Sequence, residues 1–509
     1  MRTRTLLLIF TSACLLVFSF PGIEQPFCIW FALVPLIYIM EGRSTYRCFL
    51  LGWLSGFLFY TGLIYWIVVV TTTYGKLPYP VGIVLMLLLS GYLALYMGVS
   101  FALARFVEVK SSLPFPLLLP FFWVALEYAR SFLFSGFPWE NLGYSQYRHL
   151  TLMQCADITG VYGISFLVVW VNAAVYLLIR GIVLTRIPWK AVALTIVMLA
   201  AIFLYGRFRI QEVSVLSPAS FPIDVGLVQG NVAQDIKWDK NFLDETLDRH
   251  RALTRSALEA GAKLVIWPES ATPFYFQNEP FYRQALFDLI RNRDAYLLIG
   301  SPAFASENRR LFSFNSAFLL SPEGGIAGRY DKMHLVPYGE YVPLKGLFFF
   351  VDKMVEGIGD FRPGKSISLM PLPDSDFGVL ICYEIIFPDL TRRFVKQGAD
   401  FLVNITNDAW FGNTSAPYQH FSMAVVRAIE NKRYIARAAN TGISGIISPI
   451  GEIEAASVVF SEASLVGSVS PLQLTTLYTR YGDVFAISIT FAAMMLLAAA
   501  VKKSFVKSI

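Results

Sequence analysis

The sequence predicts a polytopic α-helical membrane bundle plus an α/β domain that is inserted before the last transmembrane helix. Three observations support this fold class. Of the 509 residues, 55% are hydrophobic and only 15% are charged, whereas about a quarter of a typical soluble chain is charged. Long apolar runs fill the first 206 residues and return only near the C-terminus. The intervening segment alternates strand-like and helix-like stretches, as layered α/β domains do.

Eight apolar runs predict the transmembrane helices. Several are close to the roughly 20 residues that a spanning helix needs, although the first two are short. The runs lie at residues 5–20, 27–40, 48–70, 81–103, 115–133, 161–181, 190–206 and 484–501. We therefore expect a membrane domain of seven transmembrane helices at residues 1–206, and a final helix with a short tail at residues 484–509.

Positive residues between the runs predict the orientation of the chain. One set of turns, with the two ends, carries twelve Lys and Arg residues, whereas the alternate short turns carry only Lys76 and Arg148. Loops rich in Lys and Arg stay in the cytoplasm, so both termini are expected there and residues 207–483 on the other side. This pattern also accounts for the net charge of +6 without a basic stripe for nucleic acid.

Two features of the apolar runs have alternative interpretations. Residues 1–20 are also compatible with a signal peptide, and 11–14 faintly resemble a lipoprotein cleavage box, but Thr11 is not aliphatic and the apolar run continues past Cys14. An uncleaved anchor fits the charge pattern better. Glu127 and Arg130 lie three residues apart in the fifth run. Because ionisable groups in lipid usually face the bundle interior, a structural pair near the outer interface is expected.

Residues 207–483 are expected to form one α/β domain. Helices are predicted at residues 241–260, 280–292, 388–397 and 417–432. Strands are predicted at residues 223–228, 263–267, 295–299, 312–320, 325–330, 378–381, 401–405, 434–439 and 444–449.

Cys382 stands at the end of one of these strands. Residues 378–381 form a short apolar run, and Pro388 and Asp389 suit the first turn of the next helix. Open α/β sheets gather their chemistry at such strand ends. The alternative is a structural thiol, because free cysteine is among the most buried residue types. The five cysteines include no C-x-x-C pair and there are only four histidines, so no zinc or redox site is expected.

Glu269 and Lys332 also follow strand-like runs. A carboxylate near a thiol can accept its proton, and a nearby ammonium group can stabilise the thiolate. The same ammonium group can stabilise the oxyanion that forms when the sulfur attacks a carbonyl. For either residue taken alone, an ordinary surface charge is the simpler interpretation.

Five segments share a distinctive pattern: Trp267-Pro268-Glu269, Asp331 to Glu340, Ile381-Cys382-Tyr383-Glu384, Asn404 to Gly412 and Arg437 to Gly442. Together they resemble the carbon–nitrogen hydrolase (nitrilase) superfamily. With the seven expected spans before them and one after, the whole chain is similar to the membrane-bound N-acyltransferase branch of that superfamily. One departure is Ala409, where the family favours glycine, and the alanine is expected to stiffen the loop before Trp410.

The resemblance implies a nitrilase-like α-β-β-α sandwich and a role for each of several residues. Glu269 is implied as general base, Lys332 as oxyanion stabiliser and Cys382 as nucleophile, while His334 is expected to fix its loop. Supporting roles are implied for Glu340, Tyr383 and Glu384. Trp238 is implied to line the substrate entrance, with packing as the alternative.

The resemblance also implies the reaction and its place. A phospholipid acylates Cys382, and the thioester passes its chain to the α-amino group of the diacylglyceryl-cysteine of apolipoproteins, the last step of lipoprotein maturation. The enzyme is expected in the bacterial inner membrane, among membrane lipids, with its catalytic domain in the periplasm. No metal, organic cofactor or nucleic acid is expected. The alternatives are a membrane-tethered amidase or nitrilase that uses water, and a non-catalytic lipoprotein-binding or transport scaffold.

Residues 340–364 contain an aromatic run, Leu347 to Phe350, and several glycines. Long loops without regular structure are often lids, and aromatic residues favour the membrane interface. We expect a lid that admits acyl chains, with a core segment of the domain as the alternative.

Overall fold

The computed structural model describes residues 3–216, 222–235, 237, 240–291, 293–307, 309–341 and 361–506. Trp238 and most of the expected lid, including its aromatic run, lie outside these residues. The chain divides into two compact units. A helical unit comprises Met1–Val68, Pro78–Ile210 and Tyr481–Ile509, and an α/β unit comprises Val69–Leu77 and Gln211–Arg480.

Every apolar run forms one or more helices. Within the described residues, four helices, α5, α9, α10 and α16, are long and apolar enough to cross a membrane, and α3 with the following α4 and η2 forms a fifth candidate, bent by 54°. That the shorter helices also span the membrane stays a prediction, and so does the total of seven transmembrane helices at residues 1–206. The elements are α1 (Thr3–Phe18), η1 (Pro26–Trp30), α2 (Val34–Met40), α3 (Thr45–Leu63), α4 (Trp66–Val69), η2 (Val70–Tyr74), α5 (Tyr79–Lys110), α6 (Phe115–Arg130), α9 (Val161–Val183), α10 (Trp189–Leu216) and α16 (Val484–Val506).

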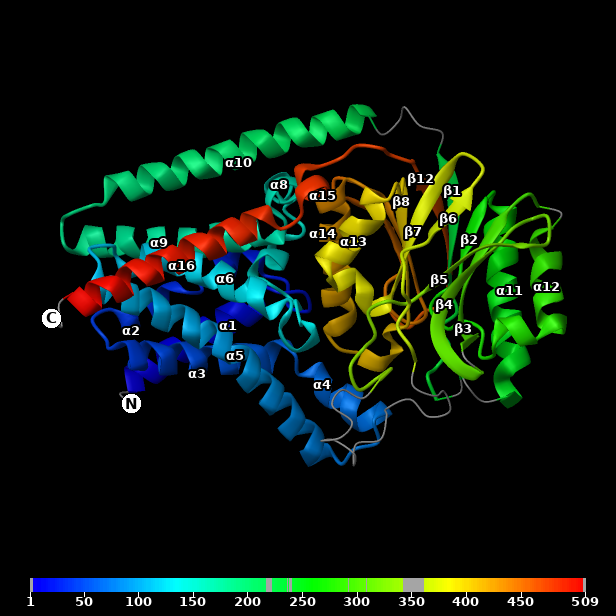
Figure 1. The fold of residues 1–509 in the computed structure, drawn as a ribbon, viewed down its shortest axis with the longest axis horizontal. Helices are drawn as coiled ribbons and strands as arrows, with labels where there is room; N and C mark the ends of the chain where they lie inside the picture. The colour runs from blue at the N-terminus through cyan, green and yellow to red at the C-terminus, as the bar shows by residue number, and fades with distance from the viewer. Residues whose placement is uncertain are drawn as a thin grey trace. The chain divides into compact units, whose positions relative to one another are not determined.

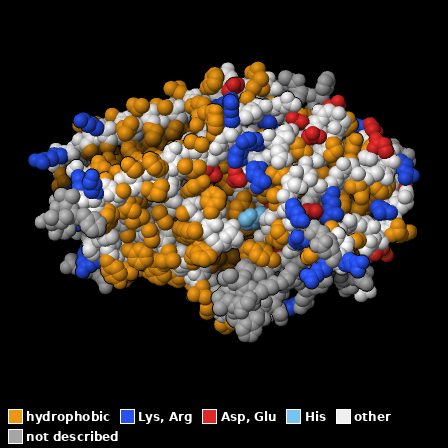
Figure 2. Space-filling view, in the orientation of Figure 1, with side chains coloured by type: hydrophobic (Ala, Val, Ile, Leu, Met, Phe, Trp, Pro, Cys, Tyr) orange, Lys and Arg blue, Asp and Glu red, His pale blue; other side chains and the backbone are white. Residues whose placement is uncertain are grey.

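The helical unit presents an apolar surface. On the face drawn in Figure 2, hydrophobic side chains cover most of this unit, and charged side chains are more frequent over the α/β unit. On α10, Leu194, Ile196, Val197, Phe203 and Leu204 are between 52% and 67% exposed. A helix with this much exposed apolar surface suits a lipid environment. The chain is therefore a membrane protein.

Glu127 and Arg130 are buried inside the helical unit. Oε1 of Glu127 accepts hydrogen bonds from Trp123 Nε1 at 3.0 Å and from the Leu142 N–H at 2.9 Å. The Arg130 guanidinium donates to the hydroxyl of Tyr60. Each charged group therefore has its own polar partners, as a structural role requires in an apolar surrounding.

The α/β unit contains two six-stranded sheets with the strand orders β12-β1-β2-β3-β4-β5 and β11-β10-β9-β8-β7-β6. The first sheet is made of β1 (Ile223–Gln229), β2 (Leu264–Ile266), β3 (Tyr296–Glu307), β4 (Arg310–Leu320), β5 (Ile326–Asp331) and β12 (Ala463–Val469). The second is made of β6 (Leu369–Leu372), β7 (Ser375–Ile381), β8 (Phe401–Thr406), β9 (Ile435–Ala439), β10 (Gly445–Ile447) and β11 (Ile453–Ala456).

Helices cover the outer face of each sheet. In Figure 1, α11 (Leu243–Glu259) and α12 (Pro280–Ile290) lie against the first sheet, and α13 (Pro388–Lys396) and α14 (Ala416–Asn431) lie against the second. This is the α-β-β-α sandwich that the resemblance implied. The central strands of each sheet are parallel and their partners toward the edges are antiparallel. Central strands are buried on both faces, as in β8, whose six residues are all buried. This burial explains why their sequences are mostly apolar.

The first and last strands of the unit are neighbours. β12 pairs antiparallel with β1, with Ile223 opposite Val469 and Gln229 opposite Ala463. Gln229 also accepts a hydrogen bond from Ser444 Oγ at 2.7 Å, just before β10 of the second sheet. The β1–β12 pairing therefore holds the last strand of the domain against its first strand. The hydrogen bond between Ser444 and Gln229 links the second sheet to the first.

Candidate active site

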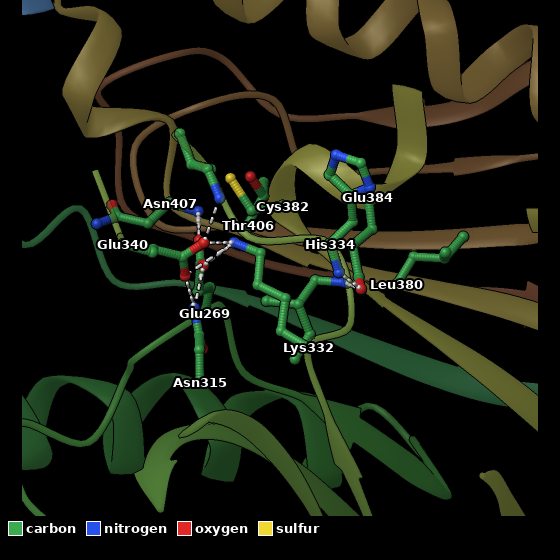
Figure 3. Close-up of polar contacts among 12 residues, drawn as sticks. Glu269, Asn315, Lys332, His334, Glu340, Leu380, Cys382, Glu384, Thr406 and Asn407 are labelled. Atoms are coloured by element: carbon green, nitrogen blue, oxygen red, sulfur yellow. Dashed lines mark hydrogen bonds and ion pairs between the residues drawn. The ribbon is translucent and has the colours of Figure 1, made fainter. Parts of the chain in front are cut away.

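Both sheets contribute to one cluster of polar side chains (Figure 3). Glu269 lies just past β2, and Lys332 directly follows β5, so both come from the first sheet. Cys382 directly follows β7 of the second sheet and begins the helical turn η8 (Cys382–Ile386). All three are buried, with 6%, 1% and 9% of their surface exposed. The structure therefore brings together the three residues for which the sequence predicts chemistry.

The Lys332 ammonium group lies between two carboxylates. Its Nζ atom is 3.2 Å from Oε1 of Glu269 and 3.0 Å from Oε2 of Glu340. Burial lowers the pKa of Lys332, but the charges of Glu269 and Glu340 outweigh burial and raise that pKa above its ordinary value. Lys332 is therefore held as a cation at the centre of the cluster.

Amide groups fix the orientation of both carboxylates. Nδ2 of Asn315 donates to Oε1 of Glu269 and to Oε1 of Glu340, at 2.7 Å in each case. The backbone N–H of Asn407 donates to the other oxygen of Glu269 at 3.0 Å, and that of Val336 donates to the other oxygen of Glu340 at 2.8 Å. All four carboxylate oxygens thus have a fixed donor in addition to Lys332.

Cys382 occupies an unusual backbone conformation. Its φ is +53°, in the left-handed region that costs a residue with a Cβ atom about 1–2 kcal/mol. A buried network holds this turn: Nε2 of His420 lies 3.2 Å from the Cys382 carbonyl oxygen, and Nδ1 of His420 lies 3.0 Å from Asp408. Arg437 donates to the second oxygen of Asp408 at 2.8 Å. The sharp change from strand to helical turn therefore has dedicated support.

The Cys382 thiol keeps its proton in the resting site. Burial raises its pKa to about 12, and the negative charge of Glu269 acts in the same direction. Lys332 and a hydrogen bond with Thr406 act in the opposite direction. Reaction therefore requires the proton to leave as the sulfur attacks, and a neighbouring carboxylate is the group that can accept it.

Glu384 joins the loops on either side of the site. Four donors surround its carboxylate: the N–H groups of Ile381, Met333 and His334 at 2.8, 2.7 and 3.0 Å, and the hydroxyl of Tyr330 at 2.8 Å. Burial raises the pKa of Glu384 to about 7, although these donors favour its charged form. Because its carboxylate links Ile381, just before Cys382, to Met333 and His334, just after Lys332, Glu384 suits a positioning role.

Tyr383 and His334 pack on the ring of Phe387, with ring centroids 5.2 and 3.7 Å away. Burial, helped by the charge of Lys332, lowers the pKa of His334 to about 4. His334 is therefore neutral and weakly basic, which fits a loop-fixing role better than that of a general base. Trp238 lies outside the described residues, so its proposed place at the substrate entrance stays a prediction.

Sequence reasoning assigned no role to Asn315, Asn407, His420 or Lys237. In the sequence Asn315 is one of several polar residues within β4, with Ser313 and Ser316 close by, so nothing in the pattern sets it apart. Lys237 is buried, and its Nζ donates to the backbone oxygen of Glu269 at 3.0 Å. Among the described residues, no group of three or more His, Cys, Asp or Glu side chains is arranged to hold a metal ion.

Comparison with known families gives two matches that together span most of the chain. Residues 12–174 match the apolipoprotein N-acyltransferase N-terminal domain, and residues 224–476 match the carbon-nitrogen hydrolase family. The second match contains all of the site residues described above.

Curated relatives match over nearly the full length. The chain is 45% identical over 507 residues to an apolipoprotein N-acyltransferase of Geobacter metallireducens, covering 98% of this chain and 96% of the relative. It is 33% identical to an apolipoprotein N-acyltransferase of Methylococcus capsulatus, and the match covers 96% of this chain and 94% of that relative. Among solved structures, a Nesterenkonia AN1 amidase of the nitrilase superfamily aligns with a TM-score of 0.38 and 19% identity, over 52% of this chain and 93% of the amidase.

Proposed function

The chain belongs to the apolipoprotein N-acyltransferase family, whose members join a membrane domain to a carbon–nitrogen hydrolase domain, and on this basis we propose how its site works. The enzyme is an acyltransferase that uses a lipid donor and a lipoprotein acceptor. The specific donor is a phospholipid, and the acceptor is the α-amino group of a diacylglyceryl-cysteine.

One observation carries the proposal: a buried ammonium group bonded to two carboxylates lies beside a buried cysteine at a strained strand end. In the first half-reaction the Cys382 proton passes to Glu269 while the sulfur attacks the ester carbonyl carbon of the phospholipid. The negative charge that develops on the carbonyl oxygen is stabilised by Lys332. The C–O bond then breaks, Glu269 returns the proton to the departing alkoxide, and a lysophospholipid leaves.

The second half-reaction uses the same groups in the reverse order. The neutral α-amino group of the acceptor attacks the thioester carbonyl, and Glu269 accepts a proton from the amine nitrogen. The C–S bond breaks, the amide is released, and the Cys382 thiolate recovers its proton from Glu269. Glu340 holds Lys332 in place throughout, while Glu384 and Tyr383 keep the Cys382 turn in position.

We propose the bacterial inner membrane as the location, with the catalytic domain at residues 207–483 in the periplasm and both termini in the cytoplasm. The support is the distribution of Lys and Arg among the turns of the sequence. In this arrangement residues 1–206 provide seven spans and residues 484–509 the last span and a cytoplasmic tail.

Mass spectrometry of the purified enzyme tests the chemistry. With phospholipid alone, we expect one acyl chain on Cys382, sensitive to neutral hydroxylamine, and release of a lysophospholipid. The adduct should persist in water, since an acyltransferase must protect its intermediate from hydrolysis. A diacylglyceryl peptide with a free amino terminus should discharge it, and the same peptide with a blocked terminus should not.

Cysteine variants provide the control. Cys382→Ser should form no thioester, whereas Cys155→Ser should behave like the wild type because Cys155 lies in the helical unit. Rapid discharge by water would favour an amidase-like hydrolase instead. An adduct on another cysteine would defeat the assignment of Cys382.

A further inference from the structure

The site contains a second buried lysine that the proposed chemistry does not use. Lys237 is 3% exposed, and its Nζ atom donates to the backbone oxygen of Glu269 at 3.0 Å. Its charge interacts with the carboxylate of Glu269 and with Cys382. Buried lysines are rare unless a partner stabilises their charge, so this position calls for a specific reason.

The segment that carries Lys237 is anchored to the site. After β1, the N–H and carbonyl groups of Val232 bond the side chain of Asn440 at 3.0 and 2.7 Å. Oε1 of Gln234 accepts from Nδ2 of Asn407 at 2.7 Å, and the N–H of Asn407 binds Glu269. Lys237 is therefore placed by the same loop that orients the general base.

The charges of the cluster need a second cation. Glu269 and Glu340 together carry two negative charges, and Lys332 supplies one positive charge between them. The remaining negative charge opposes formation of a thiolate at Cys382, because like charges in a buried site repel. A charged Lys237 brings the four groups to neutrality. Moving the Cys382 proton to Glu269 then rearranges charge within the site without creating an excess.

We propose that Lys237 is a positioning residue for the acyl transfer, which acts through Cys382 and Glu269 by supplying the second positive charge of the site. This inference rests on the proposed role of Cys382 as nucleophile. In this proposal Lys332 stabilises the reacting carbonyl oxygen. Lys237 lies at the backbone oxygen of Glu269 and offsets the negative charge of the two carboxylates from there.

The charge of Lys237 should depend on pH near neutrality. Burial lowers its pKa to about 8, against the opposing influence of Glu269 and Cys382. The charges of Lys237 and Arg249 also act on His250, but burial, the largest cause, lowers the pKa of His250 to about 4, so this histidine stays neutral. Below about pH 8 Lys237 is charged and supports the thiolate, and above that pH the support is lost.

The test measures alkylation of Cys382 by iodoacetamide in the full-length enzyme without lipid, with the modified peptide quantified by mass spectrometry across a pH series. Lys237→Gln keeps a hydrogen-bond donor without charge, and Lys237→Arg keeps a charge at high pH. Near neutral pH we expect alkylation of Cys382 in Lys237→Gln to be slower than in the wild type, by up to about tenfold. Raising the pKa of the Cys382 thiol by one unit would lower the thiolate fraction about tenfold. The difference in alkylation rate between Lys237→Gln and the wild type should narrow as the pH rises past about 8, because the wild-type lysine then loses its own charge.

Matched variants separate the charge from the hydrogen bond. Lys237→Arg should keep the wild-type rate near neutral pH and exceed it at high pH, because a guanidinium does not lose its proton there. Lys237→Met should match Lys237→Gln, and Lys263→Gln, at an exposed lysine, should match the wild type. Wild-type rates in Lys237→Gln at every pH, or slowing in Lys237→Met alone, would overturn the proposal. Alkylation needs no phospholipid, so failure of thioester formation would be a distinct result.

Discussion

At the residue scale, one ammonium group organises the site. Lys332 is 1% exposed and bonds both Glu269 and Glu340, so it stays charged despite its burial. A charge that is already paired and oriented needs no rearrangement when an oxyanion forms next to it. The same pairing offsets the repulsion between the two carboxylates, so Lys332 is the structural centre of the cluster as well as the proposed oxyanion stabiliser.

Replacement of Lys332 tests this role. Lys332→Met should reduce acyl transfer by roughly 10²–10³, the usual loss for one oxyanion donor. Lys332→Arg should recover only part of the activity, because a planar guanidinium cannot replace a compact ammonium group between two carboxylates. The measurement is the rate of peptide acylation, with Lys263→Met, at an exposed lysine, as the control. Near-normal turnover of Lys332→Met would rule out the role.

Asn315 offers a second test at the same scale. Asn315→Leu has a similar size but removes one donor from Glu269 and one from Glu340. Leaving buried acceptors with fewer donors costs about 1–3 kcal/mol, so both the thermal midpoint and the acylation rate should fall. Asn315→Asp should be worse, because a third carboxylate beside two others repels them. An aspartate variant as active as the leucine variant would contradict this reading of the cluster.

At the scale of elements, β3 packs closely against the segment that carries Glu269, the proposed base. A Cβ atom on Gly300 would lie 2.4 Å from the Pro268 carbonyl oxygen and 2.7 Å from the Glu269 Cα atom. These contacts are to backbone, which cannot move aside without moving Glu269. The absence of a side chain at Gly300 therefore lets β3 pack directly against the backbone that carries Glu269.

Alanine at this position should uncouple the base from the site. Gly300→Ala should destabilise the domain by about 1–3 kcal/mol, as overpacked cores are, and should lower acyl transfer more than tenfold, since small misplacements of catalytic groups are costly. Gly325→Ala is the matched control, because the nearest atom to its added Cβ is 3.8 Å away. Thermal unfolding and acylation rates measure the two effects. Equal behaviour of the two variants would mean that Glu269 is not placed by β3.

The elements that the sequence predicts are those with strong local patterns. Central strands such as β8 are mostly apolar, and α11 and α14 are long and periodic, so each is found within a few residues of its expected place. The edge strands β6, β11 and β12 are not predicted, since edge strands carry shorter or mixed patterns. β3 extends to Glu307, beyond its apolar start, because its antiparallel pairing with β4 continues that far.

The site residues divide in the same way, into those that a local sequence pattern indicates and those that only the folded structure reveals. Glu269, Lys332 and Cys382 each follow the end of a strand, so their positions along the chain already mark them as candidates. Asn315 is hidden inside β4, and its importance follows only from register, since the Lys332 N–H bonds the Asn315 carbonyl oxygen at 2.8 Å. Lys237 lies in a turn, where a lysine ordinarily indicates solvent, and only the folded chain shows that it is buried.

At the scale of the whole molecule, the orientation of the chain is open to direct measurement. A reporter fused after Leu216 should register outside the cytoplasm, and one fused after Lys507 should register inside, because positive residues gather on one set of turns. Expression of each fusion with compartment-specific reporters gives the answer. Both reporters on the same side would remove the last span and the proposed arrangement with it.

The pairing of β1 with β12 also sets a schedule for biosynthesis. β1 is complete at Gln229, yet its outer partner is not made until Ala463 to Val469 have been translated. At about 5–20 residues per second, the edge of β1 waits roughly 10–50 seconds for that strand. An unpaired strand edge invites pairing with other chains. Until β12 has been made, the outer edge of β1 is therefore open to such pairing, and the domain that surrounds Cys382 is completed only after nearly the whole chain has been translated.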